Sequence, residues 1–239
     1  MSWRCSGKSN GALIDNMRDA GLIKNASVEA AMRRTDRGNY APKSGAFEDR
    51  PQRIGFNVTI SAPHMHAHAL EHMLPCLRGG ATVLDVGCGS GYLCTCLAHM
   101  VGATGRVVGI DYVKGLTDMS LANISKADGG LLKSGKVQIV LGDGWLGHAA
   151  AAPYDCIHVG AAAARVPEEL VRQLKPGGLM IIPVGPQGGQ QHLVRVDKGQ
   201  DGAITQHILM GVRYVPLVEV NAAASVSTSM PASSKGTLL

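Results

Sequence analysis

The chain has 239 residues, 45% of them hydrophobic, which is enough for one large domain that buries a core without disulfides. No apolar run approaches the roughly 18 residues of a membrane helix, and we expect no signal peptide and no membrane partner. The six cysteines form no C-x-x-C pair, which is typical of a protein in the reducing cytosol. We therefore expect a soluble cytoplasmic protein. The net charge of +5 is concentrated in residues 1–56 and lacks the dense, aromatic-rich basic stripe of nucleic-acid binding, so no nucleic-acid partner is expected.

Residues 9–37 predict two short helices, because Leu13 and Met17 fall on one helical face and Gly21 interrupts the pattern. A turn-rich segment, residues 40–55, follows. We expect residues 1–56 to form a small helical N-terminal addition that packs on the core of the main domain.

From residue 57 onward the chain alternates strand and helix patterns. The expected strands are 81–86, 105–111, 136–141, 154–160 and 177–184, and the expected helices lie near 63–76, 91–101, 113–127 and 167–174. This alternation predicts an α/β fold with a doubly wound, mostly parallel, Rossmann-like sheet. Segments 191–196 and 204–217 add an antiparallel C-terminal pair, which makes seven strands within a domain of residues 57–220. The Ala/Ser/Thr-rich segment 221–239 is expected to be disordered.

The most informative motif is the run Val83–Gly91, in which an apolar strand leads into three alternating glycines. Glycine allows a sharp turn and a close approach to a ligand, and the N–H groups that begin the next helix favour an electron-rich group. Asp111, at the end of the second strand, is placed to accept hydrogen bonds from ribose hydroxyls. Asp143, between Gly142 and Gly144 after the third strand, is placed to accept one from an adenine amino group, although it also suits an ordinary Asp-Gly turn. Together these residues predict a nucleoside-containing cofactor.

The spacing of the glycines indicates which cofactor this is. A dinucleotide fingerprint reads G-x-G-x-x-G, whereas here the third glycine comes one residue early and Tyr92 occupies the last position, which disfavours a dehydrogenase. Asp85 precedes Gly87 by two residues, and its negative charge suits a cationic cofactor without phosphates. S-adenosyl-L-methionine, a sulfonium with an amino-acid tail, meets that description.

A second motif runs from Thr59 to His68 and contains a serine ahead of a predicted helix. Ser61 precedes Pro63 by two residues, so it is either a helix cap or a residue of an active site. The histidines of this region do not form a metal site, because only those four apart share a helical face and no carboxylate or thiolate set completes the ligands. We therefore expect no metal.

At these motifs the sequence resembles the protein-L-isoaspartate (D-aspartate) O-methyltransferases, over nearly the whole chain from Trp3 to about Leu217. The Thr-Ile-Ser-Ala-Pro-His-Met block is highly specific to that family, whereas the glycine loop is shared by many methyltransferases. The other matching segments are Thr35-Asp36-Arg37, Ile54-Gly55-Phe56, Gly142-Asp143-Gly144, Ala152-Pro153-Tyr154-Asp155, Leu174-Lys175-Pro176-Gly177-Gly178 and Pro183-Val184-Gly185-Pro186.

The resemblance implies methyl transfer from S-adenosyl-L-methionine to the free carboxylate of L-isoaspartyl or D-aspartyl residues in damaged proteins and peptides, by a monomer. It implies that Ser61 is the active-site serine. The expected cofactor contacts include residues of the glycine loop and of the block around Ser61. They are Val58, Thr59, Ile60, Ser61, His66, Asp85, Gly87, Cys88, Gly89, Ser90, Asp111, Tyr112, Asp143 and Gly144. Val218 departs from the family, because animal relatives commonly carry a threonine there, and the valine side chain cannot make a polar contact with the cofactor.

The chemistry agrees with these residue types. A carboxylate, with a reference pKa near ~4, is already a nucleophile at neutral pH, so no general base is required. Charge is lost as carboxylate and sulfonium react, so a cation gripping the attacking oxygen would stabilise the ground state more than the transition state. A neutral hydroxyl such as that of Ser61 can orient the carboxylate and leave it reactive. Backbone pairing with an extended peptide is expected near His66 and along residues 210–216.

Two other functions are compatible with the same motifs. One is methylation of a small molecule or a nucleic acid on the same fold, although Gly160-Ala161-Ala162-Ala163 replaces the motif typical of amino-group methylation. The other is a non-catalytic, cofactor-binding module that recruits damaged proteins, which the intact Ser61, Asp111 and Asp143 disfavour.

Overall fold

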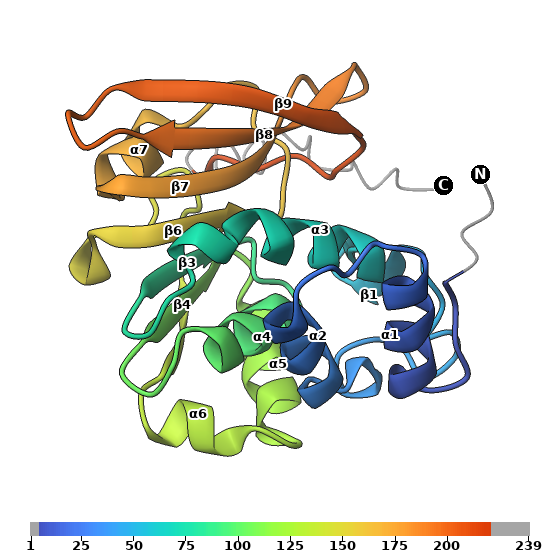
Figure 1. Cartoon of the computed structure of the whole chain (residues 1–239). Coiled ribbons are helices and arrows are strands. Elements are labelled where there is room, and N and C mark those ends of the chain that lie inside the picture. Colours follow the sequence, from blue (N-terminus) through green and yellow to red (C-terminus); the bar gives the residue numbers. More distant parts are fainter. Residues whose placement is uncertain (1–4, 221–239) are drawn as a thin grey trace, which may run out of the picture.

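One seven-stranded sheet organises the chain (Figure 1). The computed structural model describes residues 5–220, so the tail predicted to be disordered, 221–239, lies outside the described residues. The strands stand in the order β5-β4-β3-β6-β7-β8-β9, with bounds β3 (Thr82–Val86), β4 (Arg106–Asp111), β5 (Val137–Leu141), β6 (Tyr154–Val159), β7 (Leu174–Val184), β8 (Gln191–Lys198) and β9 (Ile204–Val212). The first five pair in parallel and the last two pair antiparallel, which confirms the predicted sheet.

The two faces of the sheet are covered unequally by helices. The helices are α1 (Asn10–Asp19), α2 (Ala26–Arg34), α3 (Pro63–Met73), α4 (Tyr92–Met100), α5 (Lys114–Ser125), α6 (Gly129–Lys133) and α7 (Glu168–Gln173). Helices α1 to α5 bury their apolar side chains in one cluster with Val83 and Val107, whereas Leu84 and Val108 face a second cluster with α7 and the loops beside it. Because successive strand residues point to opposite faces, neighbours in sequence enter different clusters.

Four details differ from the sequence predictions. Strand β7 begins at Leu174 and not at residue 177, so the residues between the predicted helix and the predicted strand are already part of the strand. Strand β9 ends at Val212 and not at residue 217. Helix α6 and a hairpin of β1 (Gln52–Gly55) and β2 (Val58–Ile60) were not predicted. The hairpin was hidden because its strands are short and its turn residues resemble a loop.

The N-terminal residues are packed against the main domain. Helix α2 contacts α4 and α3, and Leu13, Met17 and Met32 are fully or almost fully buried in the same cluster as the sheet. The expected boundary after residue 56 falls within the turn of the β1–β2 hairpin, so hydrogen bonds of the hairpin cross it. Within residues 5–220, none of the helices combines the length and the apolar character needed to cross a membrane.

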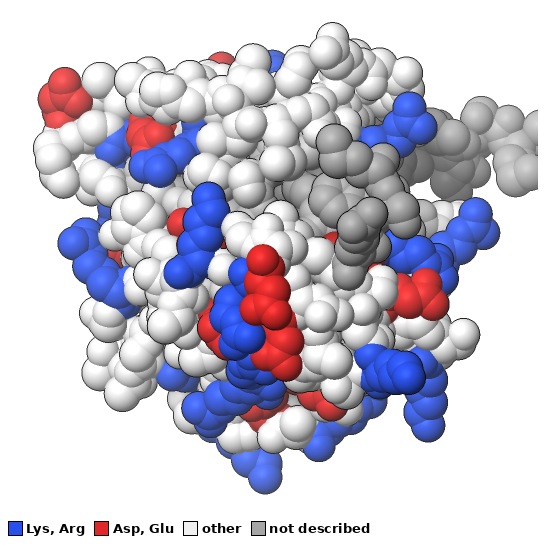
Figure 2. Space-filling model, turned by 45° about the vertical axis from the view of Figure 1, so that its right-hand side comes forward, with Lys and Arg blue, Asp and Glu red and all other residues white. Residues whose placement is uncertain are grey.

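Acidic and basic side chains are interspersed on the face shown in Figure 2. Several charged side chains of the two N-terminal helices are paired: Arg33 contacts Asp15 and Glu29, and Arg18 also contacts Glu29. Such exposed pairs contribute little to stability, about 0–1 kcal/mol each. They do, however, partly neutralise the positive charge of the N-terminal residues, because each arginine lies next to carboxylates.

Gly109 leaves no room for a side chain in the centre of β4. A Cβ atom there would lie 2.7 Å from Cys94 Sγ and 2.8 Å from Ile139 Cδ1. We expect Gly109→Ala to lower the free energy of unfolding by about 1–3 kcal/mol, because overpacking forces its neighbours off their positions. Urea denaturation measures this loss. Gly211→Ala is the matched control, since a Cβ at Gly211 meets nothing within 4 Å; equal effects of the two changes would contradict this account of packing.

Candidate active site

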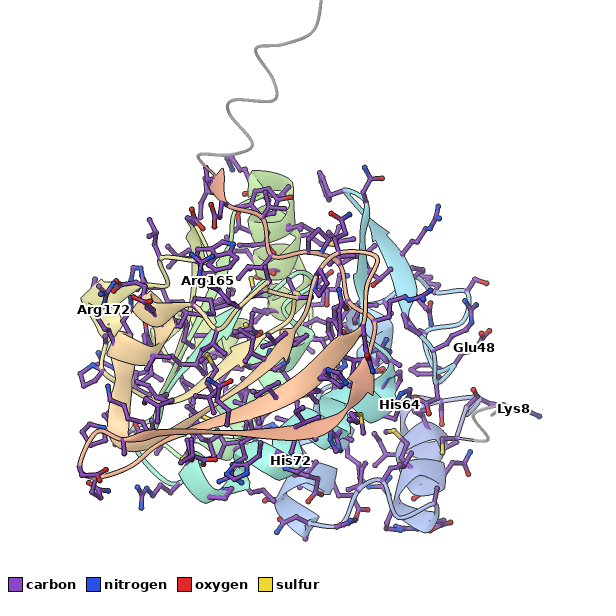
Figure 3. All side chains as sticks on the ribbon, turned by 90° about the horizontal axis from the view of Figure 1, so that it is seen from above. Lys8, Glu48, His64, His72, Arg165 and Arg172 are labelled. Carbon is purple, nitrogen blue, oxygen red and sulfur yellow. The ribbon has the colours of Figure 1, made fainter. Side chains whose placement is uncertain are left out.

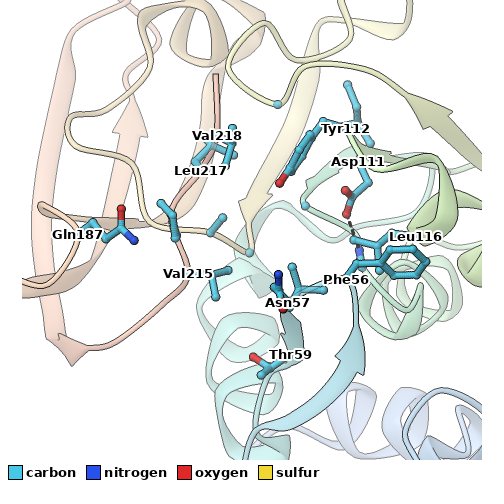
Figure 4. Close-up of a pocket in the computed structure, with 18 residues that line it drawn as sticks. Phe56, Asn57, Thr59, Asp111, Tyr112, Leu116, Gln187, Val215, Leu217 and Val218 are labelled. Atoms are coloured by element: carbon cyan, nitrogen blue, oxygen red, sulfur yellow. Dashed lines mark hydrogen bonds between the residues drawn. The ribbon is translucent and has the colours of Figure 1, made fainter. Parts of the chain in front are cut away.

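A cavity of about 370 Å³ lies at the carboxyl ends of β3 and β4, where ligands bind in open α/β sheets. Figure 4 shows Asp111, Tyr112 and Phe56 on one side of it, and Leu217 and Val218 on the other. Of the predicted cofactor residues, those that line it are Val58, Thr59, Gly87, Gly89, Asp111, Tyr112 and Gly144. Further residues that were not predicted to contact the cofactor line it too: Phe56, Asn57, Leu116, Gln187, Val215, Pro216 and Leu217. Val215 and Pro216 belong to the segment that was expected to pair with a peptide.

The other predicted residues surround a small adjoining cavity of about 40 Å³. Its walls include Ile60, Ser61, His66, Asp85, Cys88, Ser90 and, missed by the sequence analysis, His158. Thr59, Gly87, Gly89 and Gly160 line both cavities, so the two share part of a wall. The structure therefore brings the predicted residues together, with the exception of Asp143.

The glycine loop has a backbone conformation that favours glycine at three positions. Gly87, Gly89 and Gly91 have φ values of 72°, 53° and 82°, in the left-handed region that favours glycine. The N–H groups of Gly87 and Cys88 donate to the carbonyl oxygen of Ile110 at 2.8 and 3.1 Å. These bonds join the loop to the end of β4, and its glycines present no side chain to the main cavity.

Asp111 connects the loop to the cavity. Its carboxylate accepts hydrogen bonds from the N–H groups of Gly89 at 3.1 Å and Val113 at 3.2 Å. The side chain is 5% exposed, and burial raises the pKa of Asp111 above its usual value. A carboxylate has about four acceptor positions, so capacity remains for the hydroxyls of a ribose.

Asp85 is engaged by the protein through both of its oxygens. His158 Nδ1 lies 2.7 Å from Asp85 Oδ1, and the thiol of Cys94 donates to Oδ2 at 3.0 Å. Asp85 and His158 are opposite each other in the register of β3 and β6. The negative charge predicted for a cationic cofactor thus has an imidazole partner, which the sequence analysis missed because the two residues are far apart in the chain.

Asp143 adopts the turn role that the sequence analysis left open. Its two oxygens accept the N–H groups of Trp145 at 2.8 Å and Val220 at 3.2 Å. It lines a neighbouring surface pocket with Trp145, whereas Gly144 lines the main cavity. A Cβ atom at Gly144 would lie 2.7 Å from Val86 Cγ1, so only glycine leaves that wall flat.

Ser61 lies between the small cavity and a wider cleft of about 650 Å³. It does not cap helix α3: the N-cap is Ala62, and the carboxylate of Asp49 instead accepts the N–H of His64 at 3.0 Å. Burial raises the pKa of Tyr214, whose side chain also shares a hydrogen bond with Ser61. Ser61 is therefore a wall residue and not a helix cap.

The wider cleft meets the main cavity along a shared wall. Thr59, Gly160, Gln187, Val215 and Pro216 line both, and the cleft continues past Ser61 to Arg213 and Tyr214. A small molecule in the cavity and a larger one in the cleft would thus meet beside Thr59 and Ser61. This arrangement suits group transfer between two molecules.

The histidines of α3 do not converge on one point: His64 contacts an aspartate, and His68 and His72 contact each other. His64 Nδ1 lies 2.7 Å from Asp49 Oδ1, and the rings of His68 and His72 contact each other with centroids 4.4 Å apart. Figure 3 shows His64 and His72 apart along α3. Within the described part of the chain, no group of three His, Cys, Asp or Glu side chains could hold a metal ion.

A family model described as Protein-L-isoaspartate(D-aspartate) O-methyltransferase (PCMT) matches residues 8–222. This chain belongs to that family. A Caenorhabditis elegans relative named "Protein-L-isoaspartate O-methyltransferase" is 48% identical over 217 residues, which cover 91% of this chain and 96% of the relative. "Protein-L-isoaspartate O-methyltransferase 1" of Arabidopsis thaliana is 46% identical over 210 residues, covering 87% and 90%.

A solved structure of the PCMT family has the same fold. It is a putative protein-L-isoaspartate O-methyltransferase of Plasmodium falciparum in complex with S-adenosyl-L-homocysteine. It is 34% identical in sequence, with a TM-score of 0.82, and the match covers 89% of this chain and 99% of that chain. The resemblance stated from the sequence is thereby confirmed.

Replacing Asp111 tests both its support of the glycine loop and its contact with the cofactor in this PCMT family member. In Asp111→Asn an amide nitrogen, which only donates, replaces one of the two oxygens that accept the N–H groups of Gly89 and Val113. We expect this change to lower the midpoint of thermal unfolding of the ligand-free protein, and to weaken S-adenosyl-L-homocysteine binding by ~10- to 100-fold through loss of charge-assisted hydrogen bonds. Calorimetry measures both quantities. Unchanged affinity would show that Asp111 does not contact the ligand.

Proposed function

We propose that this chain is an enzyme that transfers a methyl group from S-adenosyl-L-methionine to the free carboxylate of L-isoaspartyl and D-aspartyl residues in damaged proteins and peptides, and so initiates their repair. The observation that carries the proposal is the meeting of a glycine-walled cavity with an open cleft beside Ser61. Membership of the PCMT family and the names of the relatives support the same reaction.

The cavity fits the cofactor. The glycines of the left-handed loop and Gly144 leave the parts of the wall that they form without side chains, and Asp111 offers acceptors to the ribose. When bound, the cofactor supplies an electrophilic methyl group. We propose that its contacts are the predicted ones: Val58, Thr59, Ile60, Ser61, His66, Asp85, Gly87, Cys88, Gly89, Ser90, Asp111, Tyr112, Asp143 and Gly144. Asp143 lines a neighbouring pocket and would meet the cofactor only at the edge of the cavity beside Gly144, through the acceptor position that each of its oxygens retains. Val218 lines the cavity and offers only an apolar contact.

The side chains where the cavity and the cleft meet suit an attacking carboxylate. Thr59, Ser61 and Gln187 are neutral there, so they orient an anion without the strong ground-state stabilisation that a cation would add. Attack requires no proton removal, since the carboxylate is already ionised at neutral pH. Alignment of the two reactants therefore supplies most of the rate. Ser61 acts in this scheme as the catalytic residue that orients the carboxylate.

The cleft supports a peptide substrate. It is larger than the cofactor cavity, and Gly188, Gly189 and residues 213–216, part of the segment predicted to pair with a peptide, are among its lining residues. Backbone contacts accept many side-chain sequences, as repair of diverse proteins requires. We further propose that the enzyme acts as a monomer in the cytoplasm, with residues 1–56 as an addition to a catalytic domain of residues 57–220.

A matched pair of peptides tests the reaction. One peptide carries an isoaspartyl residue and the other an aspartyl residue at the same position. With labelled S-adenosyl-L-methionine, we expect base-labile methyl ester on the isoaspartyl peptide alone. Equal labelling of both, or none with the cofactor still bound, would contradict the proposal, and the second outcome would favour a recruiting module.

Ser61→Ala tests the role of the hydroxyl. We expect kcat to fall by ~10- to 100-fold because the carboxylate loses its orientation, while the affinity for S-adenosyl-L-homocysteine changes little. Steady-state kinetics and calorimetry provide the two numbers. Ser27→Ala, on the exposed start of α2, is the control for loss of a serine. Parallel losses of turnover and affinity would mean that Ser61 only shapes the cavity.

A further inference from the structure

Arg37 is a buried cation without an ion pair. Its side chain is 0% exposed, and no carboxylate within residues 5–220 approaches it to ion-pair distance. Burial lowers the pKa of its guanidinium, which nevertheless stays charged. Its Nε has no hydrogen-bond partner in the described structure. Burying a charge without a partner is costly, so its remaining contacts must offset that cost.

Those contacts lie behind the proposed site. Nη2 of Arg37 donates to the carbonyl oxygen of Ser61 at 2.8 Å, and Nη1 lies 3.4 Å from Nδ1 of His66. The guanidinium carbon is 5.4 Å from the centre of the Tyr92 ring, within the range of a cation–π contact. Arg37 lines neither cavity nor cleft, whereas Ser61, His66 and Tyr92 all line the small cavity.

The N-terminal helices hold Arg37 in place. Its backbone N–H donates to Oδ1 of Asn10 at 3.2 Å. The amide of Asn10 donates to the carbonyl oxygens of Met32 at 3.0 Å and Arg33 at 3.2 Å. One buried side chain of α1 thus connects the end of α2 to the turn that carries Arg37.

The contact with His66 selects one form of its ring. A guanidinium has donors only, so Nδ1 of His66 must accept, and a neutral ring then carries its proton on Nε2. Burial, followed by the charge of Arg37, lowers the pKa of His66 well below its usual value, so the ring is neutral. Of its two nitrogens, only the donor Nε2–H remains for other contacts.

We propose that Arg37 is a positioning residue for methyl transfer, which fixes the backbone of Ser61 and the Nε2–H tautomer of His66 from outside the cavity. This inference rests on the proposed function, since it assigns Arg37 to the same reaction. It also gives the N-terminal residues a part in turnover, because they carry the guanidinium to the back of the site.

Arg37→Met is the direct test, because methionine fills a similar volume without charge or donors. We expect kcat for the isoaspartyl peptide to fall by up to about 100-fold, since small displacements in an active site have that effect. The affinity for S-adenosyl-L-homocysteine should fall less, by up to about tenfold, because Ser61 and His66 are two of many proposed cofactor contacts. Nitrogen NMR of His66 should change from a single Nε2–H tautomer to a mixture. Arg37→Lys should restore part of kcat. Arg34→Met, an exposed cation three residues earlier, is the control.

A second variant keeps the test valid if Arg37→Met does not fold. Glutamine at position 66 offers an amide oxygen to Arg37 and N–H donors in place of Nε2–H, whereas methionine offers neither. We expect His66→Gln to retain several times the kcat of His66→Met. Wild-type turnover in Arg37→Met, an unchanged His66 tautomer, or equal rates for the two His66 variants would overturn the proposal. A wild-type protein that is inactive on the isoaspartyl peptide would instead refute the proposed function, and the NMR result would still decide the tautomer.

Discussion

The hydrogen bonds that attach the glycine loop to the end of β4 are the constraint on which the rest of the site depends. Gly87 and Cys88 donate to the carbonyl oxygen of Ile110, and Gly89 donates to Asp111. They hold three glycines in left-handed conformations that other residues rarely adopt. The loop therefore leaves a cavity at the edge of the sheet, and Asp111 both supports the loop and faces that cavity.

The segment that carries Ser61 is held by charged groups placed behind it. Asp49 caps α3 by accepting the N–H of His64, and Arg37 donates to the carbonyl oxygen of Ser61. The helix start and the serine backbone are thus fixed without use of the serine side chain as a cap. The charges act on backbone groups, and the side chains at the meeting of cavity and cleft stay neutral. This separation suits a reaction in which charge disappears, because fixed charges next to the reacting atoms would oppose it.

The buried titratable groups near the cavity each have a polar partner. Asp85 pairs with His158, and His66 is kept neutral beside Arg37. Each charge near the cavity thereby meets a polar partner from another part of the chain, as buried charges require. Because Arg37 comes from the N-terminal residues and His158 from β6, segments far apart in sequence must fold together before the site is complete. Activity and the packing of the N-terminal helices are consequently linked.

The sequence by itself determined the alternating α/β pattern, the cofactor class and the family. Those features are local: apolar periodicity, the spacing of Gly87, Gly89 and Gly91, and a contiguous block around Ser61. Only the tertiary structure decided that Asp85 pairs with His158 and that Asp49, not Ser61, caps α3. These pairings join residues between 15 and 73 positions apart, and periodicity carries no information about which distant side chains meet. For the same reason the contact of Arg37 with Ser61 could not be predicted: the sequence does not distinguish an arginine that the fold will bury from one that stays exposed.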